Sequence, residues 1–121
     1  MAKHNEIGEK GEELAANLLK EKAYELLERN WRYSRAEIDI IAKKEGVLVF
    51  VEVKTRTNIS FGRPEQFITA KKKKLLVEAA SVYMDLVEHD WEIRFDVISV
   101  ILREGASPEI HHFKDAFFPG L

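Results

Sequence analysis

Apolar residues along the chain fall into two helical and five strand-like patterns. Spacings of three and four residues predict helices over residues 5–22 and about 65–87. Short apolar runs bounded by turn residues predict five strands, over residues 24–33, 37–43, 47–55, 92–102 and 109–113. Residues 57–64 carry Asn, Ser, Gly and Pro and predict a loop before the second helix. The resulting order of elements is α-β-β-β-α-β-β.

The lengths of the connections predict how the strands pair. Short turns between the first three strands predict an antiparallel meander. The helix between the third and fourth strands predicts a right-handed crossover, which makes those two strands parallel. We therefore expect an α/β fold, in which a mixed sheet is flanked by helices. A chain of 121 residues fits one domain over residues 1–121.

The composition narrows the classes of protein that fit this fold. The chain has no cysteine, which excludes disulfides, thiolate zinc sites and cysteine nucleophiles. It has no apolar stretch of about 18 residues and no visible signal peptide. We therefore expect no membrane span and a cytoplasmic location.

The net charge of −2 is distributed unevenly along the chain. Residues 1–28 carry a net charge of −3, residues 29–74 carry +7, and residues 75–121 carry −6. A basic region around a group of carboxylates is the field that a polyanionic substrate and a divalent metal would require. A charge block on a solvated face is the alternative explanation.

Two short acidic signatures lie in the basic region, on the second and third predicted strands. They are Glu37-Ile38-Asp39 and Glu52-Val53-Lys54. The apolar run 47–51 leads directly into the second signature, and carboxylates rarely lie in such surroundings without a compensating cation. A hairpin across Glu45-Gly46 pairs residues whose numbers sum to about 91, which places Asp39 opposite Glu52.

These acids predict a metal site. Asp39, Glu52 and the carbonyl of Val53 could supply three oxygen ligands to Mg²⁺, and Glu12 could reach from the first helix as a fourth, directly or through water. Lys54 shares a strand face with Glu52 and would orient a water or stabilise developing negative charge. The alternative is that Lys54 only neutralises the two acids as an ion-pair cluster.

Basic residues flank the predicted site and are candidates for contacts with phosphates. These candidates are Arg32, Arg35, Arg56 and Lys71. Lys71 begins the apolar stripe of the second helix and belongs to a run of four lysines. Each arginine also fits an ordinary surface position. Glu37 is interpreted as the surface partner of a nearby arginine, with a supporting role in the site as the alternative.

Three polar residues outside this region are expected to be structural. Asp96 lies between apolar residues of the fourth strand, where it would cap or pair with a basic residue. His111 and His112 alternate faces in a strand, so they cannot bind one metal together.

An ordered series of motifs covers about residues 6–117. The motifs are Gly8-x-x-Gly11-Glu12-x-x-Ala15, Asn30-x-Arg32, Glu37-Ile38-Asp39, Val49-Phe50-Val51-Glu52-Val53-Lys54-x-Arg56, Phe61-Gly62, Lys71 and Arg94-Phe95-Asp96-Val97. This series resembles the bacterial YraN family, which is classed with the restriction-endonuclease-like PD-(D/E)-x-K fold and is distantly similar to archaeal Holliday junction resolvases. The chain departs from the family at Ala36, where Gly is usual before Glu-Ile-Asp.

The resemblance implies a metal-dependent endonuclease that hydrolyses phosphodiester bonds of DNA, with branched or structured DNA as a candidate substrate. It places Glu12, Asp39, Glu52 and Lys54 at the catalytic positions, and it implies Mg²⁺ as the cofactor, with Mn²⁺ as a substitute. Junction cleavage requires two sites related by a two-fold axis, so the distant relatives imply a homodimer. The alternative is a non-catalytic nucleic-acid-binding or scaffold protein in DNA processing that retains the nuclease fold.

Overall fold

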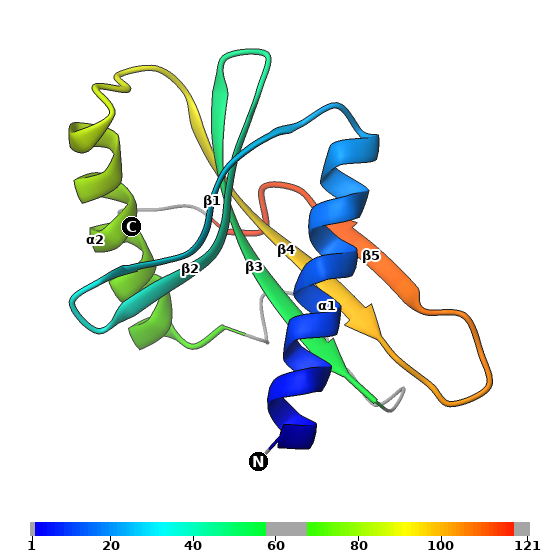
Figure 1. Ribbon diagram of the computed structural model, residues 1–121. Helices are drawn as coiled ribbons and strands as arrows, with labels where there is room; N and C mark the ends of the chain where they lie inside the picture. The colour runs from blue at the N-terminus through cyan, green and yellow to red at the C-terminus, as the bar shows by residue number, and fades with distance from the viewer. Residues whose placement is uncertain (1, 58–67, 118–121) are drawn as a thin grey trace.

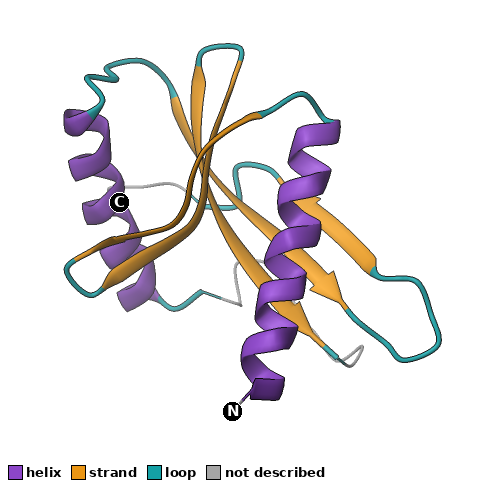
Figure 2. Ribbon diagram, viewed as in Figure 1, coloured by secondary structure: helices purple, strands orange, loops and turns teal. Residues whose placement is uncertain are grey.

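The computed structural model describes residues 2–57 and 68–117. Within these residues, five strands form one sheet in the order β1-β2-β3-β4-β5, with α1 against one face and α2 against the other (Figure 1). The elements are α1 (Ala2–Glu21), β1 (Glu25–Tyr33), β2 (Ala36–Lys44), β3 (Val47–Arg56), α2 (Ala70–Leu86), β4 (Ile93–Ile101) and β5 (Glu109–Phe113). Figure 2 shows the same helix–sheet–helix layering by secondary structure.

The pairing of the strands confirms the predicted topology. The pairs β1–β2 and β2–β3 are antiparallel, and β3–β4 is parallel with α2 as the crossover between them. The last strand, β5, returns antiparallel to β4. The fold is therefore a mixed α/β sheet in the predicted order α-β-β-β-α-β-β, and the predicted strands match those of the structure within one or two residues.

The start of the second helix differs from the prediction. It begins at Ala70 rather than near residue 65, since Thr69 is extended at φ −72° and ψ 162°. The Oγ1 atom of Thr69 accepts a hydrogen bond of 3.1 Å from the Lys72 N–H, which caps the helix. The apolar spacing misplaced this start because a cap depends on one side chain and not on periodicity. Residues 58–67, which include most of the predicted loop, lie outside the described residues.

The core lies in two layers, one on each face of the sheet. The layer under α2 contains Phe50 and Phe95, whose rings stack at 5.4 Å, and the layer under α1 contains alternate valines of β3. Alternation along β3 therefore directs Glu52 to the α2 face, next after Phe50 on that face. Neither of the two helices described, α1 and α2, is long and apolar enough to cross a membrane.

Regular alternation breaks in β2 at Asp39. Ile38 and Ile41 both belong to the layer under α2, whereas Ile40 and Ala42 belong to the layer under α1. In a regular strand, residues 38 and 40 would share a face. Asp39 lies where the two layers change over along β2, and its carboxylate reaches the backbone N–H of Val53 in β3.

A close approach between α1 and β3 is made at Gly11. A Cβ atom at this position would lie 1.9 Å from Oγ1 of Thr55, so only glycine fits. The neighbouring Ala15 and Ala16 are fully buried against the sheet. These small residues bring α1 close to the sheet, and Glu12 lies directly after the closest point.

Candidate active site

Asp39 and Glu52 are buried carboxylates on adjacent strands. Only 9% of Asp39 and 5% of Glu52 are exposed. The predicted register, with residue numbers that sum to 91, is confirmed from Ile40↔Val51 to Lys44↔Val47. The ladder ends there, one pair before Asp39. Instead, Oδ2 of Asp39 accepts a hydrogen bond of 2.8 Å from the backbone N–H of Val53, so its side chain continues the connection to β3.

The two carboxylates are close enough to influence each other electrostatically. Burial raises the pKa of Asp39, and the charge of Glu52 raises it further, to about 8. The hydrogen bond from Val53 and the charge of Lys72 act in the opposite direction, but with smaller effect. Near neutral pH, this pair therefore favours a shared proton or a bound cation.

The two oxygens of Glu52 have different surroundings. Oε2 contacts Nζ of Lys72 and lies 3.7 Å from Nζ of Lys54. Oε1 is buried and has no hydrogen-bond partner within the part of the chain that the structure describes. A buried carboxylate oxygen without a partner is costly, so the geometry favours a ligand at this atom.

Lys54 and Lys72 reach Glu52 from different elements. The Glu52–Lys54 ion pair confirms that these two residues of β3 share a face. Burial and the positive charge of Lys72 lower the pKa of Lys54. Burial alone would also lower the pKa of Lys72, but the hydrogen bond and the negative charge of Glu52 raise it. Lys72 is therefore the main counter-ion of Glu52.

Sequence reasoning missed Lys72. It placed Lys71 at the start of the stripe of α2, but Lys71 is exposed, and the buried face of the helix begins with Leu76. Lys72 lies four residues before Leu76, on the same side of the helix, and so it points to the sheet. The spacing of four residues between Lys72 and Leu76 could have predicted this position. It did not, because the start of the helix was predicted about five residues too early.

Glu12 borders the carboxylate pair from α1. Its Oε1 accepts a hydrogen bond of 3.0 Å from Asn30 Nδ2 in β1. Its negative charge contributes to the raised pKa of Asp39, which places it within electrostatic reach of the pair. Among residues 2–57 and 68–117, no three His, Cys, Asp or Glu side chains form a ready-made metal cluster. Asp39 and Glu52 are thus the close pair, and Glu12 stands farther away.

The residues present fit a hard divalent cation. Asp39 and Glu52 offer carboxylate oxygens, which are the ligands that Mg²⁺ prefers. The buried Oε1 of Glu52 has capacity for a further contact. The raised pKa of Asp39 shows that negative charge is costly here without a cation.

The three predicted arginines differ in exposure and in their contacts. Arg32 is exposed and forms an ion pair of 3.5 Å with Glu37, which confirms Glu37 as an arginine's partner. Arg35 is exposed in the turn between β1 and β2. Arg56 is half-buried at the end of β3, where its carbonyl accepts a hydrogen bond from the N–H of Leu102.

A groove joins the β1–β2 turn to the first turn of α2. Its volume is about 220 Å³, and its lining includes Arg35, Lys71 and Lys72. Glu37 is the acidic residue of the lining. Lys72 lines this groove and also contacts Glu52, so this lysine connects the groove to the carboxylate pair.

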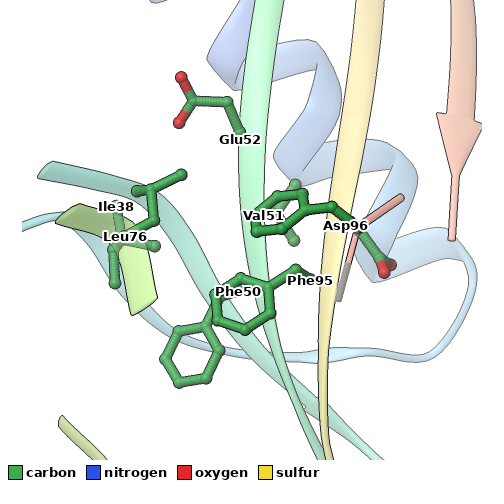
Figure 3. A pocket seen from close by; sticks show the side chains of 8 residues that line it. Ile38, Phe50, Val51, Glu52, Leu76, Phe95 and Asp96 are labelled. Carbon is green, nitrogen blue, oxygen red and sulfur yellow. The ribbon is translucent and has the colours of Figure 1, made fainter. Parts of the chain in front are cut away.

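An apolar floor lies beneath Glu52. A small cavity of about 10 Å³ is lined there by Phe50, Phe95 and Leu76. Figure 3 shows that the Glu52 carboxylate points away from the two aromatic rings, whereas the Asp96 carboxylate lies beyond β4. Apolar side chains therefore lie on one side of Glu52, and its carboxylate is directed toward Lys72 of α2.

Asp96 is a second buried acid with a different environment. It accepts hydrogen bonds from Arg94 at 2.8 and 2.9 Å, from His112 at 2.7 Å and from the Asp115 N–H at 2.9 Å. Burial alone would raise the pKa of Asp96, but these hydrogen bonds hold it below its usual range. The predicted pairing of Asp96 with a basic residue is confirmed, and the prediction that His112 is structural fits this network.

The chain is similar to a group of bacterial proteins over almost its whole length. Residues 11–100 match the model of an uncharacterised protein family, UPF0102. A UPF0102 protein of Flavobacterium johnsoniae is 48% identical over 122 residues, and one of Flavobacterium psychrophilum is 49% identical over 118 residues, with 98% of each chain covered in both cases. A UPF0102 protein of Bacteroides thetaiotaomicron is 47% identical over 121 residues, which cover 100% of this chain and 99% of the relative. The names of these relatives state no activity.

Proposed function

We propose that this chain, which belongs to the uncharacterised protein family UPF0102, is a metal-dependent endonuclease that hydrolyses phosphodiester bonds of DNA. UPF0102 is the family that the sequence motifs resemble, and it is also called YraN. One observation carries this proposal. Two buried carboxylates, Asp39 and Glu52, lie together beside two lysines, and one oxygen of Glu52 has no partner among the described residues. This arrangement is similar to the restriction-endonuclease-like site that the sequence motifs imply.

Asp39 and Glu52 would hold Mg²⁺ or Mn²⁺ together with the carbonyl of Val53, and Glu12 would contribute through water. When bound, the metal would lower the pKa of a water molecule and neutralise charge on the phosphate. Lys54, held beside Glu52, would orient the attacking water and stabilise negative charge as it develops. Such electrostatic contributions are typically about 3 kcal/mol each.

The surrounding positive charge supports a nucleic acid as the substrate, and the motifs' resemblance favours DNA. Arg35 and Lys71 line the groove that Lys72 connects to Glu52. Arg32 lies near the end of β1, and Arg56 is the last residue of β3. Contacts from such side chains to phosphates position a nucleic acid without reading its sequence. We include branched DNA as a substrate, with a homodimer that supplies two sites.

A specific observation favours the alternative of a non-catalytic nucleic-acid-binding protein. Lys54 and Lys72 already neutralise Glu52, as a structural ion-pair cluster would. On this alternative, the basic groove binds DNA with a salt-dependent affinity, and removal of divalent metals changes nothing.

The test is a titration of Mg²⁺ and Mn²⁺ by calorimetry in low salt, on the wild-type protein and on Asp39→Asn. We expect binding in the wild type that the variant loses. Linear duplex and four-way junction DNA then serve as cleavage substrates, with EDTA as the control. If no metal binds, either to the protein alone or in the presence of an uncleavable duplex or junction, the nuclease proposal is overturned. The non-catalytic nucleic-acid-binding protein then remains.

A further inference from the structure

We infer that Lys72 is a counter-ion with two positions: without metal it neutralises Glu52, and when the divalent cation binds it moves into the groove to contact a phosphate of the substrate. This inference rests on the proposed function and assigns a role to a residue that the motifs do not include. Lys72 acts on the metal by occupying its ligand, so it is a positioning residue of the site.

The contacts around Glu52 support the first position. Lys72 and Lys54 both approach Oε2, whereas Oε1 has no partner among the described residues. One carboxylate oxygen thus faces two ammonium groups while the other faces none. This uneven arrangement is what a displaceable cation at Oε2 would produce, because a metal bound through both oxygens would require that Oε2 be vacated.

The balance of charge supports the displacement. Asp39 and Glu52 carry at most two negative charges, which Lys54 and Lys72 match. A divalent cation at the same carboxylates adds two positive charges in a region where only 9% of Asp39 and 5% of Glu52 are exposed. Like charges at such short range repel strongly when solvent is excluded. One of the two lysines must therefore move away.

Lys72 is the lysine that can leave. The side chain of Lys54 is 25% exposed and comes from the centre of the sheet, where its backbone pairs with Ser99 of β4. The side chain of Lys72 is 40% exposed and comes from the first turn of α2. Its flexible stem can swing to the solvent side at little cost.

The groove provides the second position. Lys72 already lines it together with Arg35 and Lys71, so a change of side-chain rotamer would direct its Nζ into the groove. A phosphate bound beside these cations would give the ammonium group a new partner. The same lysine then weakens metal binding in the resting protein and strengthens substrate binding in the loaded one.

The first test measures metal affinity by calorimetry on Lys72→Met. Methionine keeps most of the apolar stem and a high helix propensity, so we expect a folded variant. Loss of the competing ammonium should tighten Mg²⁺ binding by on the order of tenfold, which corresponds to one close ionic contact. Lys74→Met removes the same charge from an exposed position of the same helix and should change affinity less than about twofold. Lys72→Arg should behave like the wild type.

The second test separates displacement from a static field. Lysine acylation is followed residue by residue by mass spectrometry, with and without Mg²⁺. We expect acylation of Lys72 to rise several-fold on addition of Mg²⁺, with Lys74 unchanged and with no rise in Asp39→Asn. Equal labelling of Lys72 in both conditions, or equal Mg²⁺ affinity of wild type and Lys72→Met, overturns the inference while the nuclease proposal stands. Failure of every variant to bind Mg²⁺, even with an uncleavable duplex, overturns both.

Discussion

Asp39 and Asp96 are both buried aspartates of the same sheet, yet their environments are opposite. Asp96 accepts four hydrogen bonds, from Arg94, His112 and the Asp115 N–H. The structure describes one hydrogen bond to Asp39, from the Val53 N–H, and places the negative Glu52 beside it. The pKa of Asp96 is lowered by its partners, whereas burial and Glu52 raise that of Asp39.

This difference shows that burial alone does not make an acid functional. Asp96 is fully compensated by groups of the protein, so it has no capacity for a ligand and stabilises the junction of β4, β5 and the following turn. Asp39 is only partly compensated, so it retains capacity for a cation. The distribution of hydrogen-bond donors therefore separates the structural carboxylate from the candidate catalytic one.

The largest expected effect is on cleavage. Asp39→Asn removes the negative charge that would bind the metal, and we expect DNA cleavage to fall by a factor on the order of 10³ or more. The measurement is single-turnover cleavage with excess protein, accompanied by a thermal melt to show that the variant is folded. Cleavage at the wild-type rate would remove Asp39 from the site.

The next largest effect is a loss of stability, which we expect for Asp96 and not for Asp39. Asp96→Asn would leave the buried ends of Arg94 and His112 without their charged partner, which we expect to cost about 3–5 kcal/mol. The corresponding fall in melting temperature is roughly 15 °C. Thermal or urea unfolding measures it, with Asp39→Asn as the matched variant that should not lose stability at neutral pH. Equal losses in the two variants would contradict the comparison.

The two aspartates should also give opposite dependences of stability on pH. The raised pKa of Asp39 means that its contribution is fully present below about pH 4, near the ordinary pKa. This contribution is lost as the pH rises through about 8. The lowered pKa of Asp96 means that its contribution is present above the ordinary value and lost as the pH falls through the lowered one.

Urea unfolding from pH 3 to 9 in EDTA would measure the free energy of unfolding at each pH and so separate the contributions of the two aspartates. Asp39→Asn should flatten the decline in the free energy of unfolding between about pH 4 and 8, and it should leave the fall at acid pH that Asp96 causes intact. Asp96→Asn should do the reverse. If Asp39→Asn left the decline between about pH 4 and 8 unchanged, the raised pKa would belong to another group.

The smallest effect is expected at Glu12, which influences Asp39 through its charge. Glu12→Gln should weaken Mg²⁺ binding by about threefold, because one more distant negative charge is lost. Glu13→Gln is the matched control, since Glu13 is exposed and pairs with Arg29 at 3.6 Å. Calorimetry in low salt compares the two. Equal effects in both variants would show that Glu12 acts only as part of the general surface charge.

The sequence alone determined the order of elements, the strand pairing and the two central acids. The apolar run 47–51 and the short turn at Glu45-Gly46 are local signals, and the turn predicted the register that brings β2 and β3 together. Glu52 and Lys54 share a face because side chains two apart on a strand always do. These features depend on neighbouring residues and short connections, so local patterns were sufficient.

Only the tertiary structure decided which charged groups meet at the site. The bond from the Val53 N–H to the Asp39 side chain forms where the β2–β3 backbone ladder has already ended, which alternation along the strands does not reveal. The contact of Lys72 with Glu52 depends on where α2 begins and how it docks on the sheet. The partners of Asp96 come from β4, from β5 and from the turn that follows. Packing between distant segments sets these contacts, and no periodicity along the chain encodes it.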